Sequence, residues 1–454
     1  MTDGMFRTVL VANRGEIAVR VARACRELGI RVVAVCSEAD RGSAVTRLAD
    51  RTVVIGPAAP RASYLNAAAI IEAALMTGAE AVHPGYGFLS EDADFAEACA
   101  ASGLTFIGPP VAAMRQLGDK MSARTAMAAA GLPLLPGVLD PVRDEEEAAR
   151  AAGAVGYPLI IKATAGGGGR GMRVVRGPDE LTKAYRETTA TARQLFGDGR
   201  VYLERYLAAP RHVEIQVLAD LHGNCLHLGE RDCSVQRRHQ KLIEESPAPG
   251  LPAELTGRIA EAAVRGARAA GYAGVGTFEF LVDAAGEFYF MEANCRLQVE
   301  HGVTELVAGV DLVREQLRVA AGMPLGLRQE DVRPRGVAIQ CRINAEDPAR
   351  DFMPTPGVLT EFVAPSGPFV RVDTHAFPGY RVPASYDSLL AKVLVWAPDR
   401  EQAITRMRLA LDELRVGGAG VHTTAAHLSG VLADPCFRAA AHSTQWVYDG
   451  AGAG

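Results

Sequence analysis

The chain has 454 residues, of which 48% are hydrophobic and 22% charged, and its formal net charge is −5 at pH 7. This length suggests about three domains at the usual ~150 residues each, and the composition is that of a folded protein rather than a disordered one. The slight negative charge argues against a nucleic-acid-binding surface, which needs clustered Lys and Arg.

Membrane and secretory proteins are also excluded by simple features. No apolar run approaches the ~20 residues that a membrane-spanning helix needs. The start, MTDGMFRTVLVANRG, lacks the basic head and long apolar stretch of a signal peptide. The eight cysteines form no C-x-x-C pair, so neither a zinc site nor a disulfide scaffold is predicted. We therefore expect a cytoplasmic protein with no membrane or nucleic-acid partner.

The first part of the chain alternates short apolar runs with helix-like stretches. Strands are predicted at 8–13, 31–37, 52–56, 80–85 and 104–108. This alternation predicts a doubly wound parallel sheet. Because such sheets bind ligands beyond the carboxyl ends of their strands, the loop HPGYGFLSE (83–91) is predicted to face a site.

A smaller unit is built around a glycine run. AGGGGRGM (165–172) joins two strand-like segments and opens no helix, so it differs from a dinucleotide-binding fingerprint. No G-x-x-x-x-G-K-[ST] motif of a P-loop NTPase is present. A surface turn would avoid the ordering cost of four successive glycines. We therefore predict a loop whose N–H groups cover phosphates, with Lys162 at its base.

A polar series near residue 300 is the second chemical signal. Every second position is polar: Glu292, Asn294, Arg296, Gln298 and Glu300. If the segment is extended, these side chains share one face, which is ordinarily a solvated one. The preceding 288–291 is apolar throughout, and the predicted partner strand carries a lone acid, Glu279. Buried acids need a cation, so the oxygens of Glu279, Glu292 and Asn294 are predicted to suit Mg²⁺.

A dense cationic string lies between these two signals. RDCSVQRRHQK (231–241) brings four basic side chains together just before Glu244 and Glu245. The four are Arg237, Arg238, His239 and Lys241. Such a cluster suits an anionic ligand, while a solvated turn with local ion pairs remains an open alternative.

In order and spacing, these motifs resemble those of the biotin carboxylase family of the ATP-grasp superfamily. The resemblance runs from about residue 6 to 447 and includes LGDK (117–120), RHVEIQ (211–216), EANCRLQVEH (292–301), CRINAED (341–347) and PASYDSLLAKV (383–393). It implies an α/β (overall α+β) ATP-grasp fold with three domains. These are a doubly wound N-terminal domain (1–115), an ATP-grasp domain (116–330) with a mobile glycine-loop lid (about 134–206), and a mixed α/β C-terminal domain (331–447).

The resemblance also implies a nucleotide site for MgATP. Lys120 and Lys162 are expected to hold phosphates beneath a lid that contains Gly168 and Gly169. The other expected nucleotide-binding residues are Glu204, Arg205, Tyr206, Leu207, His212, Gln236 and His239. Glu204 to Leu207 are expected to line the adenine pocket. Glu279, Glu292 and Asn294 are the implied ligands of Mg²⁺ or Mn²⁺.

The remaining implied roles concern bicarbonate and biotin. Bicarbonate is expected to contact Lys241, Arg296, Gln298 and the backbone of Val299. Glu300 is expected to deprotonate it, and Arg342 to stabilise the enolate of biotin. A carboxylate base suits this poor nucleophile, and flanking cations keep such a base ionised.

The implied reaction is the ATP- and bicarbonate-dependent carboxylation of biotin through carboxyphosphate. Two alternatives remain: another ATP-grasp ligase that joins a carboxylate to an amine, and a non-catalytic ATP-binding paralogue. The sequence departs from the family pattern at Ala293, Cys295 and Gly302, and Gly302 motivates the non-catalytic alternative. Gly302 stands where the family usually has a proline, so the loop of Glu300 is expected to be less well fixed.

The implied partners are other subunits. The chain carries no biotinylation segment and no carboxyltransferase, so we expect it to work with a biotin carboxyl carrier protein and a carboxyltransferase subunit. This would be the first half-reaction of an acyl-CoA carboxylase. Family members are commonly homodimers, and Arg20, Arg23 and Glu27 match dimer-interface positions. From the residues alone, that helix face is predicted to be solvated.

Overall fold

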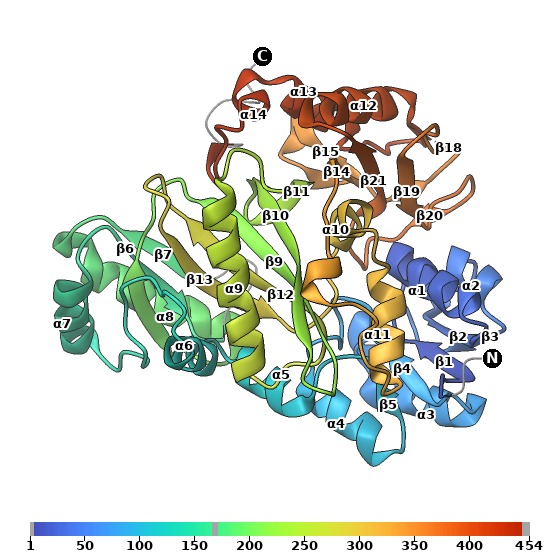
Figure 1. Cartoon of the computed structure of the whole chain (residues 1–454), viewed down its shortest axis with the longest axis horizontal. Helices are drawn as coiled ribbons and strands as arrows, with labels where there is room; N and C mark the ends of the chain where they lie inside the picture. Colours follow the sequence, from blue (N-terminus) through green and yellow to red (C-terminus); the bar gives the residue numbers. More distant parts are fainter. Residues whose placement is uncertain (1–3, 166–170, 447–454) are drawn as a thin grey trace.

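The computed structural model describes residues 4–165 and 171–446. Figure 1 shows three regions: the N-terminal sheet at one side, a small glycine-loop unit at the other, and a large sheet between them that continues into the C-terminal region. The N-terminal sheet has the order β3-β2-β1-β4-β5 and all its pairs are parallel. The doubly wound parallel sheet predicted from the alternation is therefore confirmed.

The N-terminal strands are short, and the first two are almost wholly buried, as expected for a sheet covered on both faces. They are β1 (Thr8–Val11), β2 (Arg31–Cys36), β3 (Arg51–Val54), β4 (Ala81–His83) and β5 (Thr105–Phe106). The helices between them are α1 (Gly15–Glu27), α2 (Ala44–Leu48), α3 (Ala67–Thr77) and α4 (Ala93–Ala101). The loop after β4 ends where the Asp92 carboxylate caps α4 by accepting from Phe95 N at 2.9 Å.

Two helices lead to the glycine-loop unit: α5 (Val111–Gly118) and α6 (Lys120–Ala129). The Asp119 side chain caps α6 by accepting from Ser122 N at 2.8 Å, which places Lys120 in the first turn. The unit itself has the antiparallel order β7-β6-β8 and a hydrophobic core of its own. Its elements are α7 (Glu145–Val155), β6 (Leu159–Ala163), β7 (Met172–Val175), α8 (Pro178–Phe196) and β8 (Val201–Arg205).

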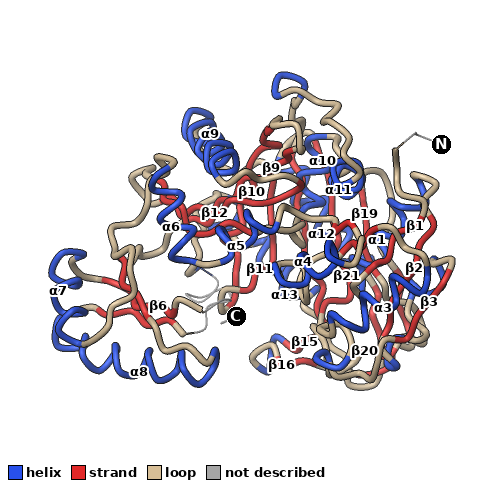
Figure 2. Tube along the Cα trace, turned by 90° about the horizontal axis from the view of Figure 1, so that it is seen from below, coloured by secondary structure: helices blue, strands red, loops and turns tan. Residues whose placement is uncertain are grey.

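The predicted hairpin around the glycine run is confirmed, because β6 and β7 pair antiparallel with Lys162 opposite Met172. Gly168 and Gly169 lie outside the described residues. Figure 2 shows α7, α8 and β6 at one end of the molecule and β1 to β3 at the other.

The largest sheet has eight antiparallel strands in the order β13-β12-β9-β10-β11-β14-β21-β19. Its bounds are β9 (Arg211–Ala219), β10 (Cys225–Arg237), β11 (Gln240–Ser246), β12 (Gly274–Val282), β13 (Phe288–Asn294), β14 (Val337–Asn344), β19 (Val370–Thr374) and β21 (Leu389–Ala397). Helix α9 (Ala253–Ala269) packs its buried apolar face on one side of β9, β10 and β12. The sheet continues past residue 330, because β11 pairs with β14.

The remaining elements surround the large sheet. They are α10 (His301–Ala308), α11 (Leu312–Ala320), α12 (Arg400–Glu413), α13 (Ala425–Ala433), α14 (Pro435–Arg438), and the short strands β15 (Glu346–Asp347), β16 (Met353–Pro354), β17 (Gly357–Val358), β18 (Glu361–Val363), β20 (Arg381–Val382) and β22 (Arg415–Gly417). Among the described residues, no helix combines the length and the apolar character that crossing a membrane would require.

Candidate active site

A row of three acids crosses the large sheet and defines the centre of the site. Glu279 on β12 lies directly opposite Glu214 on β9 and Glu292 on β13. Like charges opposite one another destabilise a sheet unless a cation separates them. The ammonium of Lys241 supplies that cation, with Nζ 2.7 Å from Glu214 Oε2 and 3.1 Å from Glu279 Oε1.

A register shift in the β12–β13 pair sets which face the acids share. Glu279 pairs with Glu292, whereas the next residue, Phe280, pairs with Phe290, so β13 has one extra residue here. The shift lets Phe290 pack on the α9 side while Glu292 faces Glu279.

The extended face that the spacing predicted is only partly correct. The strand ends at Asn294, and Arg296, Gln298 and Glu300 lie in the loop between β13 and α10. Hydrogen bonds, rather than strand periodicity, bring these loop residues to the acids. Gln298 Nε2 donates to Glu279 Oε1 at 3.3 Å, and Asn294 Nδ2, at the end of the strand, donates to the same oxygen at 2.8 Å.

Glu300 is fully buried at the start of α10, between two cations. Lys241 Nζ lies 2.7 Å from its Oε1, and Arg342 Nη2 donates to its Oε2 at 3.0 Å. Burial alone would raise the pKa of Glu300, but Lys241, Arg342 and Arg231 outweigh it and hold that pKa well below its usual value. Glu300 is therefore ionised at neutral pH.

Lys241 is the shared counter-ion of this cluster. Burial would lower the pKa of its ammonium, but Glu214, Glu279 and Glu300 raise that pKa well above its usual value. The same three acids would repel one another without it, so the charge of Lys241 holds the site together.

Arg296 lies beside this cluster and is oriented from two directions. Its Nε donates to Glu91 Oε2 at 2.8 Å, and Nη2 donates to Asn294 Oδ1 at 3.0 Å. Glu91 also accepts from Cys295 N at 3.0 Å. The loop after β4 therefore faces the site, as the strand-end rule predicts.

Arg342 is brought in by the C-terminal part of the large sheet. Its Nε donates to Glu244 Oε1 at 2.6 Å, and Gln340 Nε2 holds the other oxygen of Glu244 at 2.9 Å. Glu244 is fully buried and directs the guanidinium toward Glu300.

The expected phosphate-binding lysines lie at the junction with the glycine-loop unit. Lys162 forms an ion pair with Glu204, whose other oxygen accepts from Arg124 Nη1 at 2.8 Å. Burial, and the repulsion from Lys162, lower the pKa of Lys120 although Glu292 opposes this. Two cations thus lie near Glu292 and Glu204 at the edge of the acid row.

The remaining expected nucleotide residues are distributed around this junction. Arg205 ends β8 and donates to Val155 O, and Tyr206 and Leu207 follow it. His212 Nε2 lies 2.7 Å from Glu279 Oε2, and the Gln236 amide lies 2.7 Å from the other ring nitrogen. His239 occupies the turn between β10 and β11 with a positive φ of 65°.

The cationic string does not form local ion pairs. Arg237 and Arg238 both pair with Asp351, more than a hundred residues away in the C-terminal region. Lys241 points into the acid cluster instead. The turn is exposed at Arg238 and His239, as the alternative expects, but its ion pairs are not local.

Gly302 is the departure closest to the proposed base, and the structure gives it a steric reason. A Cβ at this position would lie 2.4 Å from Leu394 Cδ2 on β21. The neighbouring Glu300 side chain is held by Lys241 and Arg342 from both sides.

The predicted solvated face of α1 is correct for Arg23 and Glu27, which are exposed, but wrong for Arg20. The Arg20 side chain is 11% exposed, and Nη2 pairs with Glu305 at 2.9 Å and with Asp311 at 2.6 Å.

The sequence reasoning missed several site residues: Glu91, Arg124, Glu214, Arg231 and Glu244. Glu214 could have been found, since it alternates with apolar residues on β9 as Glu279 does on β12. Arg231 is fully buried and pairs with Glu214 at 2.5 Å, but no pattern marks it among neighbouring charges.

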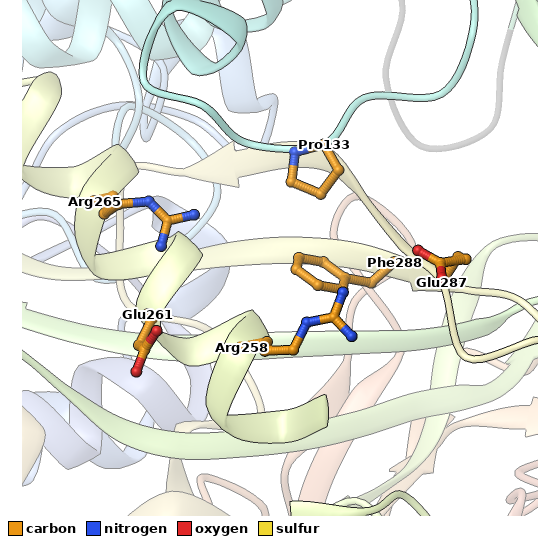
Figure 3. A pocket seen from close by; sticks show the side chains of 6 residues that line it. All are labelled: Pro133, Arg258, Glu261, Arg265, Glu287 and Phe288. Carbon is orange, nitrogen blue, oxygen red and sulfur yellow. The ribbon is translucent and has the colours of Figure 1, made fainter. Parts of the chain in front are cut away.

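A separate hollow of about 330 Å³ lies on the α9 side of β13 (Figure 3). Arg258, Glu261 and Arg265 of α9 line it together with Pro133 and Phe288. These charged side chains are exposed, and the hollow is not part of the acid cluster.

Comparison with known proteins identifies the family. Family models match residues 5–114 (biotin carboxylase, N-terminal domain), 119–328 (carbamoyl-phosphate synthase L chain, ATP binding domain) and 340–449 (biotin carboxylase C-terminal domain). A biotin carboxylase from Nostoc sp. is 50% identical over 98% of this chain and 99% of its own length. The chain belongs to the biotin carboxylase family.

Solved structures agree with this assignment and with the ATP-grasp fold. A Campylobacter jejuni biotin carboxylase–β,γ-ATP complex matches with a TM-score of 0.96 and 46% identity over 99% of this chain and 100% of that chain. The biotin carboxylase domain dimer of Hydrogenobacter thermophilus 2-oxoglutarate carboxylase, in complex with MgADP, ADP and bicarbonate, matches with a TM-score of 0.94 and 46% identity over 98% of both chains.

Two acids of the row, Glu279 and Glu292, have residue types that suit a magnesium ion. Burial, followed by repulsion from Glu279, raises the pKa of Glu292, so these neighbouring carboxylates favour a cation between them. Among the described residues no basic side chain forms an ion pair with Glu292. Carboxylate and amide oxygens from Glu279, Glu292 and Asn294 are the donors that Mg²⁺ or Mn²⁺ prefers.

Proposed function

We propose that this chain catalyses the ATP- and bicarbonate-dependent carboxylation of biotin. The observation that carries the proposal is Glu300, a buried, ionised carboxylate between Lys241 and Arg342 and within one cluster with the acid row. Such a carboxylate suits a base for an anionic substrate that flanking cations hold in place.

The first step joins bicarbonate to the γ-phosphoryl group of ATP. We assign Lys241, Arg296, Gln298 and the Val299 N–H to bicarbonate. Glu300 takes its proton, an oxygen of bicarbonate attacks the γ-phosphorus, and ADP leaves, which yields carboxyphosphate. Lys120 and Lys162 neutralise the phosphates. When bound, Mg²⁺ on Glu279, Glu292 and Asn294 would neutralise charge on the transferred group.

The second step transfers carbon to biotin. Carboxyphosphate breaks down to CO₂ and phosphate, and the phosphate removes the proton from the ureido nitrogen. The resulting enolate attacks CO₂ and forms carboxybiotin. Arg342, which Glu244 orients, would stabilise the enolate oxygen by a charge-assisted hydrogen bond.

The adenine base is proposed to lie along Glu204 to Leu207, with His212, Gln236 and His239 near the nucleotide. The Glu204 side chain is occupied by Lys162 and Arg124 and is not available to the base. The glycine loop, including Gly168 and Gly169, is proposed to close over the phosphates.

The proposed partners are a biotinylated carrier protein, a carboxyltransferase subunit and a second copy of this chain. The exposed Arg23 and Glu27 on α1 are available for the homodimer contact. A cytoplasmic location is consistent with the reduced, free cysteines expected there.

One assay separates the proposed function from the two alternatives. The pure chain is given MgATP and bicarbonate, with and without free biotin, and ADP release is measured. Biotin-stimulated ADP release is expected. Turnover that needs neither bicarbonate nor biotin would indicate another ligase, and ATP binding without turnover would indicate a non-catalytic paralogue.

A further inference from the structure

The backbone just before Glu300 is held by a buried histidine. His301 Nδ1 lies 2.7 Å from Gln298 O, and because a carbonyl oxygen only accepts, Nδ1 carries the proton. His301 is fully buried. Burial, and the cations Lys392, Arg20 and Arg371, hold the pKa of His301 well below its usual value, so the ring is neutral with one N–H.

This contact fixes the direction of the next N–H group. In a trans peptide the C=O and N–H bonds point in opposite directions. With Gln298 O turned toward His301, the Val299 N–H points away from the helix. It donates to none of the residues that the structure describes, and Val299 is only half-buried. It is therefore an oriented donor that a ligand can use.

A fully buried lysine holds the following carbonyl. Lys392 on β21 has no exposed surface, and its Nζ donates to Val299 O at 3.0 Å. Nζ also lies 3.1 Å from Glu16 Oε1 on α1 and 3.6 Å from Asp373 Oδ2 on β19. A buried ammonium is costly unless it is paired, so these two carboxylates fix its position.

The sheet register explains why Lys392 reaches this loop. Lys392 lies directly opposite Arg342 on β14 and Asp373 on β19, so the three side chains share one face. Arg342 reaches the Glu300 carboxylate, while its neighbour Lys392 reaches the Val299 carbonyl.

We propose that His301 and Lys392 are positioning residues for bicarbonate, which fix two successive carbonyls and thereby aim the Val299 N–H at the anion. Neither side chain touches the anion itself. The inference rests on the proposed function, because it takes bicarbonate as the ligand of that N–H.

The test compares Michaelis constants of matched variants. Lys392→Met alone would leave the Glu16 carboxylate without its cation, so the double variant Lys392→Met/Glu16→Gln is used, with Glu16→Gln alone as its control. His301→Phe keeps an aromatic ring but removes the donor. Lys183→Met, an exposed lysine on α8, controls for loss of a lysine elsewhere.

The expected result for both positions is a rise of about tenfold or more in the bicarbonate KM, with the ATP KM and the melting temperature near the control values. A bicarbonate KM within twofold of the controls would overturn the proposal. So would equal changes in both Michaelis constants, because a merely structural role would produce them. Wild-type turnover that does not depend on bicarbonate would instead overturn the proposed function.

Discussion

At the scale of single residues, the site is a set of charges that neutralise one another. Lys241 forms ion pairs with Glu214, Glu279 and Glu300. Arg342 forms ion pairs with Glu244 and Glu300. Removing one partner of such a buried set leaves an uncompensated charge, which typically costs about 3–5 kcal/mol. Substitutions that keep the shape of the side chain are therefore the ones that report on its chemical role.

Glu300→Gln keeps the shape of the proposed base and removes its basicity. We expect biotin-dependent turnover to fall by at least ~100-fold, the usual contribution of a general base. ATP affinity should stay nearly unchanged, because the expected nucleotide residues lie elsewhere. The measurements are ADP release and ATP titration, with Glu254→Gln, exposed on α9, as the control. Loss of ATP affinity with turnover retained would show that Glu300 is not the base.

The sequence predicted these residue types better than their contacts. Glu279 stands out as a lone acid among apolar residues, Glu292 as part of an alternating polar series, and Lys241 as part of a basic string. The shared counter-ion role of Lys241 could not be predicted, because it depends on the strand order β12-β9-β10-β11, which brings Lys241 on β11 to the acids of β9 and β12. Lys392 gave only a weak signal, as one lysine in an apolar stretch.

At the scale of elements, α10 packs closely on the C-terminal strands. Gly302 in its first turn faces Leu394 on β21, and an added Cβ would lie 2.4 Å from Leu394 Cδ2. A side chain at residue 302 would therefore require the Leu394 side chain to shift.

Gly302→Ala is therefore expected to destabilise the protein by about 1–3 kcal/mol, the usual cost of overpacking, although alanine favours helices. Thermal unfolding measures the effect. In the double variant with Leu394→Ala, the added methyl group should cost less than it does alone. Gly153→Ala on α7, where nothing lies within 4 Å, is the control and should be neutral or slightly stabilising. Equal effects at positions 302 and 153 would refute the packing argument.

The local sequence pattern predicts whether a segment is a helix or a strand, but it predicts less well where each element ends. The strands predicted at 8–13 and 31–37 match β1 (Thr8–Val11) and β2 (Arg31–Cys36). The prediction of an extended segment from Glu292 to Glu300 is wrong after Asn294. There, tertiary contacts of Arg296 and Gln298 replace strand pairing. Alternation alone does not distinguish a strand from a loop whose polar residues converge.

At the scale of the whole molecule, one antiparallel sheet joins the acid row to Arg342. The sequence predicted separate domains, and nothing in it indicates that β11 pairs with β14 across a hundred residues. Such pairing depends on long-range packing. The continuity explains how a C-terminal arginine reaches Glu300.

The C-terminal segment is tied to the same sheet through Asp232. Its carboxylate pairs with Arg211 at 2.5 Å and lies 3.3 Å from His442. Burial alone would raise the pKa of Asp232, but Arg211 and His442 hold it well below its usual value. A carboxylate with a lowered native pKa stabilises the fold above its unfolded value, near pH 4, and this contribution is lost as the pH falls through the native pKa.

Asp232→Asn is thus expected to lower the melting temperature at pH 7 by an amount that stays constant down to about pH 5 and shrinks below about pH 4. Thermal scans across this range measure it, with the exposed Asp412→Asn as the control. A difference in melting temperature between the variant and the wild type that grows as the pH falls would contradict the sign of this effect.

Transfer of carbon from bicarbonate to biotin is the most direct test of the central claim. The pure chain is incubated with MgATP, isotopically labelled bicarbonate and free biotin, and the label in biotin is counted against the ADP released. Carboxybiotin formation is expected to require all three substrates and to be lost in Glu300→Gln. ADP release with no label in biotin would contradict it.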